Sequence, residues 1–385
     1  MTSRRIRSRK QTTATLQYAD TERNADQYYF GGFQAPDPFI SLGFEQEKIA
    51  FLSRLEIGRA MKESRFDTIL SLEQWRDKAR RVLKSPFPGP TDVIHLYCRE
   101  RKIRRIKVGS DFPAGLAFRL QEVGLDLEVA PGMLFPQREI KSDEEAAAIA
   151  GGNRCSAAGI RAAERVLRES KISGNTLVYE GRRLTSERLR LEIEKTCLVM
   201  GSISQGTIVA GGVQACDPHC RGSGVLHPHE LIILDVFPRV TKTGYHGDLT
   251  RTFLKGNASD AQRRLVVSVR RAQRFALDEI KAGIRGHTIH TEIVQQFERQ
   301  GYRTEDLESG PVGFIHGTGH GLGLEIHEPP RLSDGGTRLK ENQVVSVEPG
   351  LYYPDIGGCR IEDVVRIKPD GVEMLSKLHY RWLIR

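Results

Sequence analysis

The sequence predicts an α+β protein with two domains, a smaller α/β domain followed by a larger α+β domain. The chain has 385 residues, of which 39% are hydrophobic, and this is enough to build two ordinary cores. Before about residue 140, helix-like stretches alternate with short apolar runs, whereas after residue 184 longer helical patterns alternate with compact apolar strands. No segment of 20 to 50 residues repeats, which excludes a solenoid.

Residues 25–140 are predicted to form the smaller domain. A helical pattern covers residues 48–85 and ends at a segment rich in proline and glycine. Apolar runs that resemble short strands follow at residues 106–108 and 125–129. Residues 1–24 come before this domain and are predicted to be a basic, flexible tail.

The formal net charge of +9 is concentrated at the start of the chain. Five basic residues precede the first acidic one, and they are Arg4, Arg5, Arg7, Arg9 and Lys10. The other 375 residues carry 53 basic and 49 acidic groups, a balance that predicts no large field of one sign. We therefore do not expect the folded part of the chain to bind nucleic acid.

The compartment is predicted from cysteines and apolar runs. Six cysteines in a chain of this length have neither the density nor the paired spacing of a disulfide framework, which favours a reducing compartment. The basic start is not followed by an apolar run of the kind that export requires. No stretch approaches the roughly 20 apolar residues of a membrane span, so we expect a cytoplasmic protein without membrane contact.

The larger domain is predicted to cover residues 141–385. Ser142, followed by three acidic residues, is typical of a helix start, and an apolar-periodic stretch continues from there to about residue 170. The other elements expected in this domain are helices at 184–199, 259–282 and 288–300 and strands at 231–237, 343–347 and 361–367.

Carboxylates embedded in apolar strands are the first functional signal. Asp235 directly follows the apolar run 231–234, and Glu348 follows the run 344–347. A buried, ionised carboxylate costs several kcal/mol unless it is paired or bound to a metal ion. Both acids are therefore expected to have partners.

Each of these acids has a second acid beyond a turn. Turn residues lie between Asp235 and Asp248, and again between Glu348 and Glu362, so each pair is predicted to meet across a hairpin. Four adjacent carboxylates raise one another's pKa and cannot all ionise alone. A pair of divalent cations would resolve this repulsion.

A glycine-rich segment, residues 316–328, adds histidines and contains the fifth candidate ligand. Its alternating glycines allow the backbone to approach a site closely. Their spacing matches neither the dinucleotide-binding fingerprint nor a phosphate-binding loop. His316 and His320 are four residues apart, but Gly317 stands where a helical zinc motif has glutamate.

Together these motifs resemble the pita-bread metallopeptidases. The motifs that carry the resemblance are Asp235, residues 247–253 around Asp248, residues 319–328, residues 347–350 and residues 360–363. The resemblance covers residues 143–385. It implies a pita-bread domain there, preceded by a creatinase-type domain like that of aminopeptidase P and prolidase.

The resemblance also implies a dinuclear metal site. Asp235 would bind one metal ion, Asp248 and Glu362 would bridge both ions, and His320 with Glu348 would complete the other. Ligands that are mostly carboxylate oxygens favour Mn²⁺, with Co²⁺, Fe²⁺ and Zn²⁺ as alternatives.

The implied activity is hydrolysis of the Xaa-Pro bond, at peptide N-termini or in dipeptides, by a metal-bridged hydroxide. Glu348 would relay the proton of the water, and His219 and His327 would contact the substrate and the developing oxyanion. Arg360 would hold carboxylates or substrate, and His316 would stand near the substrate with a mainly structural role in the glycine-rich segment. A homodimer is expected, and Xaa-Pro aminopeptidase and Xaa-Pro dipeptidase both stay open.

The chain departs from the family pattern at one place. Relatives commonly have Asp-x-Gly where this chain has Asp235 followed by Val236, Phe237 and Pro238, which affects the shape of the hairpin and the fit of the substrate. Two other functions are compatible with the fold, a non-catalytic binding or scaffold protein and a creatinase-like amidinohydrolase. The complete set of ligands favours a metallopeptidase over both.

Overall fold

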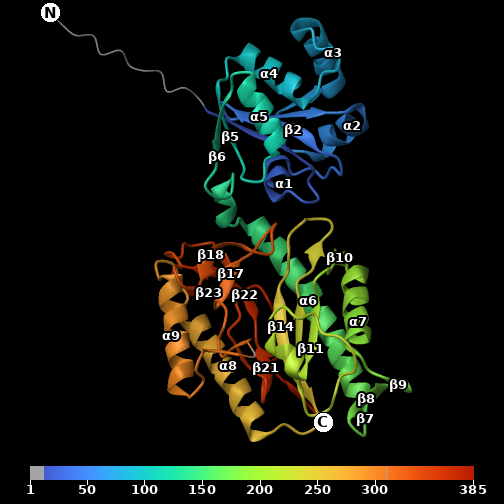
Figure 1. Cartoon of the computed structure of the whole chain (residues 1–385), viewed down its shortest axis with the longest axis vertical. Coiled ribbons are helices and arrows are strands. Elements are labelled where there is room, and N and C mark those ends of the chain that lie inside the picture. The colour runs from blue at the N-terminus through green and yellow to red at the C-terminus, as the bar shows by residue number, and fades with distance from the viewer. Residues whose placement is uncertain (1–12, 309) are drawn as a thin grey trace, which may run out of the picture. The chain divides into compact units, whose positions relative to one another are not determined.

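The computed structural model describes residues 13–308 and 310–385, which form two compact units (Figure 1). The chain divides between Pro136 and Gln137, just before the predicted boundary at residue 141. Each unit has its own sheets and its own buried apolar clusters. Within the described ranges, no helix is both long enough and apolar enough to cross a membrane.

The first unit is built on one six-stranded sheet with the strand order β4-β3-β2-β1-β5-β6. The strands are β1 Ala14–Ala19, β2 Phe39–Phe44, β3 Glu47–Leu52, β4 Thr68–Ser71, β5 Arg105–Val108 and β6 Asp126–Val129. The helices are α1 Ala25–Gly31, α2 Arg54–Glu63, α3 Leu72–Leu83, α4 Pro90–Arg101 and α5 Ala114–Glu122. β1, β2 and β3 are antiparallel neighbours, and β4, β5 and β6 join in parallel.

Two predictions for this unit are wrong. Residues 14–24 are not part of a tail, because β1 begins at Ala14 and the side chains of Ala14 and Leu16 are fully buried. Residues 48–85 are not one helical region, because they form most of β3 followed by α2, β4 and α3. The apolar end of β3 is buried between β2 and β4, and this pairing outweighs the local helical pattern. The basic residues at positions 4–10 lie outside the described part of the chain.

The second unit contains two larger sheets. The first has the order β11-β12-β14-β24, with β11 Ile208–Gly211, β12 Leu231–Val236, β14 Leu249–Lys255 and β24 Leu383–Ile384. The second has the order β18-β17-β19-β22-β23, with β17 Gly319–Gly321, β18 Glu328–Leu332, β19 Val344–Val347, β22 Asp363–Lys368 and β23 Gly371–Met374.

Smaller sheets complete this unit. They consist of β7 Lys171–Ser173, β8 Thr176–Tyr179 and β9 Arg182–Arg183; of β10 Ser202–Ile203 and β13 Arg239–Val240; of β15 Glu305–Leu307 and β16 Gly310–Val312; and of β20 Gly350–Tyr353 and β21 Gly357–Arg360. Two short 3₁₀ turns are η1 Pro136–Glu139 and η2 Gly212–Cys216.

Four helices cover the larger sheets, and they are α6 Asp143–Glu169, α7 Ser186–Val199, α8 Asp260–Glu279 and α9 Gly286–Arg299. α6 and α8 begin at capping boxes, in which Ser142 and Ser259 accept a hydrogen bond from the third residue of the helix. α6 and α7 bury apolar side chains against the first sheet, and α8 and α9 do so against the second. The predicted helices at 184–199, 259–282 and 288–300 are confirmed by α7, α8 and α9.

Strand register determines which acids face one another. In the antiparallel pair β12 and β14, Asp235 lies opposite Thr250, so Asp248 is on the same face as Asp235. In the pair β19 and β22, Val347 lies opposite Asp363, and the pairing leads directly to Glu348 and Glu362. Both predicted pairs of acids therefore meet at the end of an antiparallel strand pair.

Candidate metal centre

All five predicted ligands line one cavity with a volume of about 750 Å³. They are Asp235, Asp248, His320, Glu348 and Glu362. They come from the ends of the two antiparallel pairs and from β17, which lies beside β19. Four of the side chains are buried and Glu348 is partly buried, so the cavity brings acids from distant parts of the sequence together away from bulk water.

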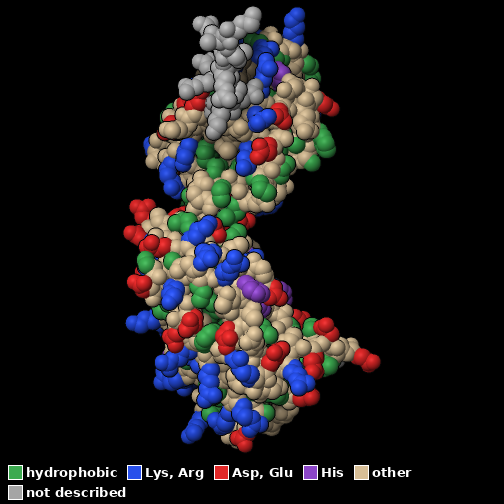
Figure 2. Space-filling model, turned by 90° about the vertical axis from the view of Figure 1, so that its left-hand side faces the viewer, with side chains coloured by type: hydrophobic (Ala, Val, Ile, Leu, Met, Phe, Trp, Pro, Cys, Tyr) green, Lys and Arg blue, Asp and Glu red, His purple; other side chains and the backbone are tan. Residues whose placement is uncertain are grey.

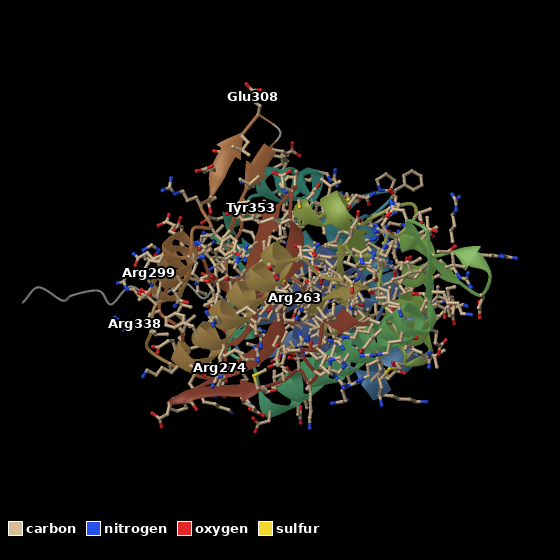
Figure 3. The ribbon with its side chains drawn as sticks, turned by 90° about the horizontal axis from the view of Figure 1, so that it is seen from below. Arg263, Arg274, Arg299, Glu308, Arg338 and Tyr353 are labelled. Atoms are coloured by element: carbon tan, nitrogen blue, oxygen red, sulfur yellow. The ribbon has the colours of Figure 1, made fainter. Side chains whose placement is uncertain are left out.

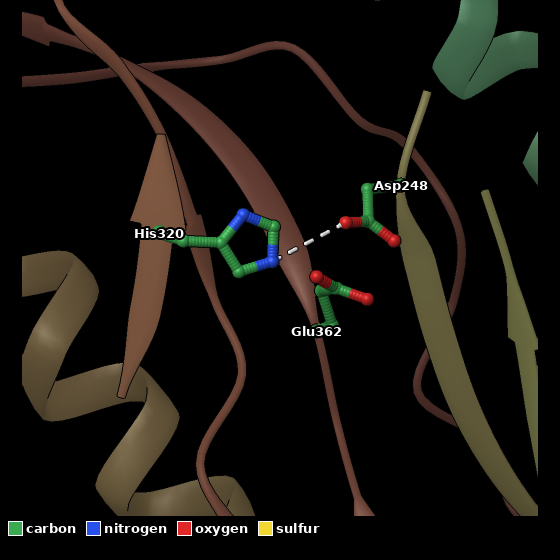
Figure 4. Close-up of side chains that lie close together, drawn as sticks. All are labelled: Asp248, His320 and Glu362. Carbon is green, nitrogen blue, oxygen red and sulfur yellow. Dashed lines mark ion pairs between the residues drawn. The ribbon is translucent and has the colours of Figure 1, made fainter. Parts of the chain in front are cut away.

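Asp248, His320 and Glu362 form the tightest group (Figure 4). One potential ligand atom of each residue lies within 4.8 Å of those of the other two. The Nε2 atom of His320 is 3.6 Å from Asp248 Oδ2 and 3.2 Å from Glu348 Oε1. An imidazole nitrogen and carboxylate oxygens from separate strands therefore face the same point.

The orientation of His320 is fixed by its neighbours. Its Nδ1 lies 3.1 Å from the carbonyl oxygen of Gly321, which can only accept a hydrogen bond, so Nε2 is left facing the carboxylates. The backbone N–H of His320 donates to Ser346 Oγ, and that hydroxyl donates to Glu348 Oε1, each at 3.1 Å. A Cβ atom on Gly319 would lie only 2.0 Å from the backbone oxygen of Ser346, so glycine is required for this close approach.

Asp248 is held against α6. Its backbone N–H donates to Asn153 Oδ1 at 2.8 Å. The two backbones meet so closely that a Cβ atom on Gly152 would lie 2.4 Å from the backbone nitrogen of Gly247. The packing of α6 against the start of β14 therefore sets the position of this candidate ligand.

Two carboxylate oxygens in the cavity have no hydrogen-bond donor. Thr250 Oγ1 donates to Glu362 Oε2 at 2.8 Å, and Arg360 Nη2 donates to Asp235 Oδ2 at 2.7 Å. The other oxygens of these acids, Asp235 Oδ1 and Glu362 Oε1, are buried and have no partner among the described residues. A buried acceptor without a partner is costly, so these two oxygens fit cation ligands.

The electrostatics of the cavity also fit a cation. Burial raises the pKa of Asp248 well above its ordinary value, and the charge of Asp235 adds to this effect. Burial and the charge of Asp248 likewise raise the pKa of Glu362 well above its usual range. Burial acts against the ionised forms of Glu348 and His320 too, but their mutual hydrogen bond lowers the pKa of Glu348 to about 2 and raises that of His320 to about 9. A protonated His320 offsets only one of the four carboxylates, whereas two divalent ions would offset all of them and would bind His320 as a neutral imidazole.

The two histidines expected to contact substrate also line the cavity, and both His219 and His327 are exposed at its edge. The ring centre of His327 is 4.4 Å from that of His320. Burial, together with the nearby charge of His320, lowers the pKa of His327 to about 4. His327 is therefore neutral near pH 7 and can donate one hydrogen bond.

Arg360 and His316 are more fully bonded than expected. Arg360 is buried, and it donates to the hydroxyl of Tyr352 at 2.8 Å as well as to Asp235. His316 Nε2 is 2.7 Å from the same hydroxyl, and His316 Nδ1 is 2.7 Å from the carbonyl oxygen of Gly317. Arg360 was expected to hold either carboxylates or substrate, and these contacts fit the binding of a carboxylate. The contacts of His316 fit a structural role.

The sequence motifs do not identify Arg331 or, apart from Phe237, the apolar part of the cavity. Arg331 lies on β18 directly opposite His320, and it also lines the cavity. It forms no ion pair with any residue in the described ranges. The apolar lining includes Phe237, Ile315 and Ile326. The signal for Arg331 is the register of two strands, which a search for acids and histidines does not use.

Comparison with known proteins shows the family to which the chain belongs. The model of metallopeptidase family M24 matches residues 147–369, more than half of the chain. The chain is 36% identical over 176 residues to an Xaa-Pro dipeptidase of Pyrococcus furiosus. The aligned region covers 44% of this chain and 47% of that protein. The match thus spans about half the length of the curated relatives.

Solved structures are similar over nearly the whole chain. An X-Pro aminopeptidase from Thermotoga maritima superimposes with a TM-score of 0.79 at 24% identity, covering 97% of this chain and 98% of that one. A prolidase from Pyrococcus furiosus gives a TM-score of 0.77 at 23% identity, covering 95% and 96%. These similarities confirm the predicted fold, a smaller α/β domain followed by a pita-bread domain.

Proposed function

The chain belongs to metallopeptidase family M24, and from this premise we propose that it is a metal-dependent Xaa-Pro dipeptidase. The observation that carries the proposal is the convergence on one cavity of five candidate ligands and of Arg331, which has no ion-pair partner among the described residues. The name of the Pyrococcus furiosus relative supports the Xaa-Pro specificity. Family membership and the complete ligand set do not favour a scaffold protein or a creatinase-like amidinohydrolase.

Two divalent ions would be held by Asp235, Asp248, His320, Glu348 and Glu362. We propose Mn²⁺, because four of these five side chains offer carboxylate oxygens and only one offers nitrogen. When bound, the ions would polarise the scissile carbonyl group and acidify a water molecule.

Glu348 would transfer a proton, and His327 would donate a hydrogen bond. The Glu348 carboxylate is ionised at neutral pH, and its Oε1 is held by Ser346 and His320. It would accept a proton from the attacking water and deliver it to the leaving nitrogen. The neutral imidazole of His327 would donate its N–H to the developing oxyanion, and His219 would hold the substrate at the cavity edge.

Arg331 favours a dipeptide over a longer peptide. In an Xaa-Pro dipeptide the proline carries a free carboxylate, and a guanidinium without a partner can bind it through two parallel hydrogen bonds. The apolar side chains of Phe237, Ile315 and Ile326 offer contacts for the prolyl ring. A longer peptide has a neutral amide at the same position and would leave Arg331 without a counter-charge.

The proposal is tested with three substrates in Mn²⁺, namely an Xaa-Pro dipeptide, its C-terminal amide and an Xaa-Pro-Xaa tripeptide. We expect wild type to prefer the free dipeptide. Arg331→Ala should lower kcat/KM on it by about 10- to 100-fold, the value of a charge-assisted hydrogen bond, with little effect on the amide. Arg338→Ala is the matched control, because the Arg338 side chain is exposed and, among the described residues, donates only to the carbonyl oxygen of Gly283.

Two outcomes would contradict the proposal at different levels. Equal turnover by wild type and Asp248→Ala would exclude the metallopeptidase assignment itself. A preference for the tripeptide that Arg331→Ala leaves unchanged would instead indicate an aminopeptidase. The cytoplasmic location and the homodimer stay predictions, and cell fractionation and light scattering test them.

A further inference from the structure

Three segments of the second unit place their basic residues on one surface, which we call the arginine face. They are the C-terminal half of α6 (154–168), α8 without its acidic end residues Asp260, Asp278 and Glu279 (261–277), and the C-terminal segment (376–385). These segments contain eleven arginines and one lysine but only one acidic residue, Glu164. Because the whole chain has a formal charge of +9, all its other residues together sum to −2.

The C-terminal segment joins the two helices into one surface. On its α6 side, Arg161 Nη2 donates to the backbone oxygen of Lys377 at 3.2 Å. On its α8 side, the guanidinium of Arg270 lies 3.4 Å from the centre of the Tyr380 ring. The basic residues of α6 and α8 therefore flank the same strip of chain.

The side chains of the arginine face are exposed and largely unpaired. All of its basic residues except the half-buried Arg270 are exposed, and they are Arg154, Arg161, Arg165, Arg168, Arg263, Arg264, Arg271, Arg274, Lys377, Arg381 and Arg385. Within the described ranges, the side chains of Arg165, Arg263, Arg264 and Arg271 form neither an ion pair nor a hydrogen bond, whereas Arg274 is paired with Asp278 at 3.7 Å. The single acid, Glu164, is buried and already bonded to Arg168.

The figures show the separation of charge. In Figure 3, Arg263 and Arg274 lie along α8, and Arg274 is on the opposite side of the view from Glu308, which is next to the tip of the β15–β16 hairpin. In Figure 2, lysine and arginine side chains gather at the lower left, while acidic side chains mark the protruding tip on the other side. None of the basic residues of the arginine face lines the metal-ligand cavity.

The chemistry of this surface fits phosphate groups. Arginine binds phosphate through two parallel hydrogen bonds and is weakly hydrated, which suits contact with a polyanion. Among the described residues of the three segments, the only large apolar side chain that is strongly exposed is Val267, at 44%. Insertion into a membrane needs a larger apolar surface than this, so a partner that is bound through phosphate contacts alone fits better than a membrane that the protein enters.

The surface also lacks the groups that read bases or stack on them. Its neutral polar side chains, such as Ser156, Ser268 and Gln273, are buried and cannot contact base edges or the 2′-hydroxyls of RNA. Tyr380 is placed against the guanidinium groups of Arg251 and Arg270, and the other two aromatic side chains of these segments, Phe275 and Trp382, are packed against the apolar core, so none offers a free platform for single-stranded bases. The surface therefore offers mainly guanidinium groups, which can bind the regularly spaced phosphates of a duplex.

We propose that the arginine face binds the phosphate backbone of duplex DNA without reading its sequence. This differs from the expectation drawn from net charge, which averaged this face with the acidic remainder of the chain. The proposal does not depend on the peptidase activity, because its residues lie outside the metal-ligand cavity.

Binding is measured by fluorescence anisotropy with a labelled duplex of roughly 20 base pairs over a range of salt concentrations. Each phosphate contact contributes about 0.9 to the slope of log K against log salt. The triple variant Arg263→Glu, Arg271→Glu, Arg274→Glu should therefore bind at least about tenfold more weakly and lose about 2 to 3 from the slope. The variant Arg154→Glu, Arg165→Glu on α6 should weaken binding in the same direction and replaces the triple variant if that does not fold.

The matched control changes three exposed arginines of α3 in the first unit, Arg76→Glu, Arg80→Glu and Arg81→Glu, with the same change of net charge. We expect this control to keep most of the binding. An equal loss in the control, or a loss only when the five basic residues at positions 4–10 are replaced, would overturn the assignment of the surface. Stronger binding to vesicles rich in anionic lipid, or to single-stranded RNA, than to duplex DNA would overturn the choice of partner.

Discussion

Two adjacent glycines of α6, Gly151 and Gly152, test how the fold holds the metal centre. A Cβ atom on Gly152 would lie 2.4 Å from the backbone nitrogen of Gly247 and 2.7 Å from the carbonyl carbon of His246. Both are backbone atoms, so one of the two segments would have to shift. A Cβ atom on Gly151 would meet only the end of the Arg154 side chain, at 3.4 Å, and that side chain can move aside.

The two substitutions to alanine should change stability in opposite directions. Alanine is more favourable than glycine inside a helix by up to about 1 kcal/mol, and this gain applies to both positions. Overpacking against rigid neighbours costs about 1 to 3 kcal/mol, and only Gly152→Ala incurs this cost. We expect Gly152→Ala to lower the free energy of unfolding by about 1 to 2 kcal/mol and Gly151→Ala to raise it by about 0.5 to 1 kcal/mol.

The shift caused by Gly152→Ala should also reach the metal centre. Gly247 directly precedes Asp248, and Asn153, next to Gly152, accepts the hydrogen bond from the backbone N–H of Asp248. Moving β14 away from α6 would displace this candidate ligand. Loss of such a supporting contact typically lowers metal affinity by about 10- to 100-fold.

Unfolding by urea and by heat, with chelator and with Mn²⁺, measures the effect on stability, and calorimetric titration measures Mn²⁺ affinity. For a unit of this size, 1 kcal/mol corresponds to about 2 to 4 °C in Tm. The reasoning is refuted if Gly152→Ala is as stable as Gly151→Ala. It is also refuted if the two variants bind Mn²⁺ equally tightly.

Three further predictions concern the supporting residues and the metal itself. Thr250→Val should lower Mn²⁺ affinity by about 10- to 100-fold in calorimetric titration, because Thr250 Oγ1 donates to Glu362 Oε2. Chelation should abolish peptidase activity and lower Tm, and added Mn²⁺ should restore both, because the ion binds only the folded protein. Burial opposes ionisation of Glu328, but the charges of Lys141 and Arg138 lower its pKa, so it stabilises the fold above its unfolded pKa of about 4.3 and loses this effect as the pH falls. Urea unfolding between about pH 5 and pH 3 should therefore depend less on pH in Glu328→Gln than in wild type, and the variant should be less stable by about 3 to 5 kcal/mol at neutral pH.

The pairing of the acids could be predicted because it follows from local patterns. Asp235 and Asp248 end apolar strands that are joined by turn residues, and the alternation of side chains along an antiparallel pair then places both acids on one face. The same reasoning applies to Glu348 and Glu362. In both cases side chains alternate between the two faces of a strand with a period of two residues. This alternation is visible in the sequence and also decides which residues share a face in the structure.

Arg331 could not be predicted in this way, because its position depends on a pairing that no turn signal specifies. It reaches the cavity because β18 lies beside β17 with Arg331 opposite His320, and the register shifts between His320 and Gly321. The strands β1 and β3 were missed for a related reason. β1 is buried between β2 and β5, and β3 is buried between β2 and β4, and a local helical or charged pattern carries no information about these neighbouring strands.

The arginine face shows the same limit for charge. The spacing of Arg154, Arg161 and Arg165 is helical, so the sequence alone places these residues on one side of α6. Only the fold adds that the C-terminal segment lies between α6 and α8 and joins the two basic helix surfaces. Net charge is a sum without positions, whereas attraction between a protein and a polyanion depends on the local density of charge. A nearly balanced chain can therefore carry a strongly basic surface, and the salt dependence of DNA binding measures that local density directly.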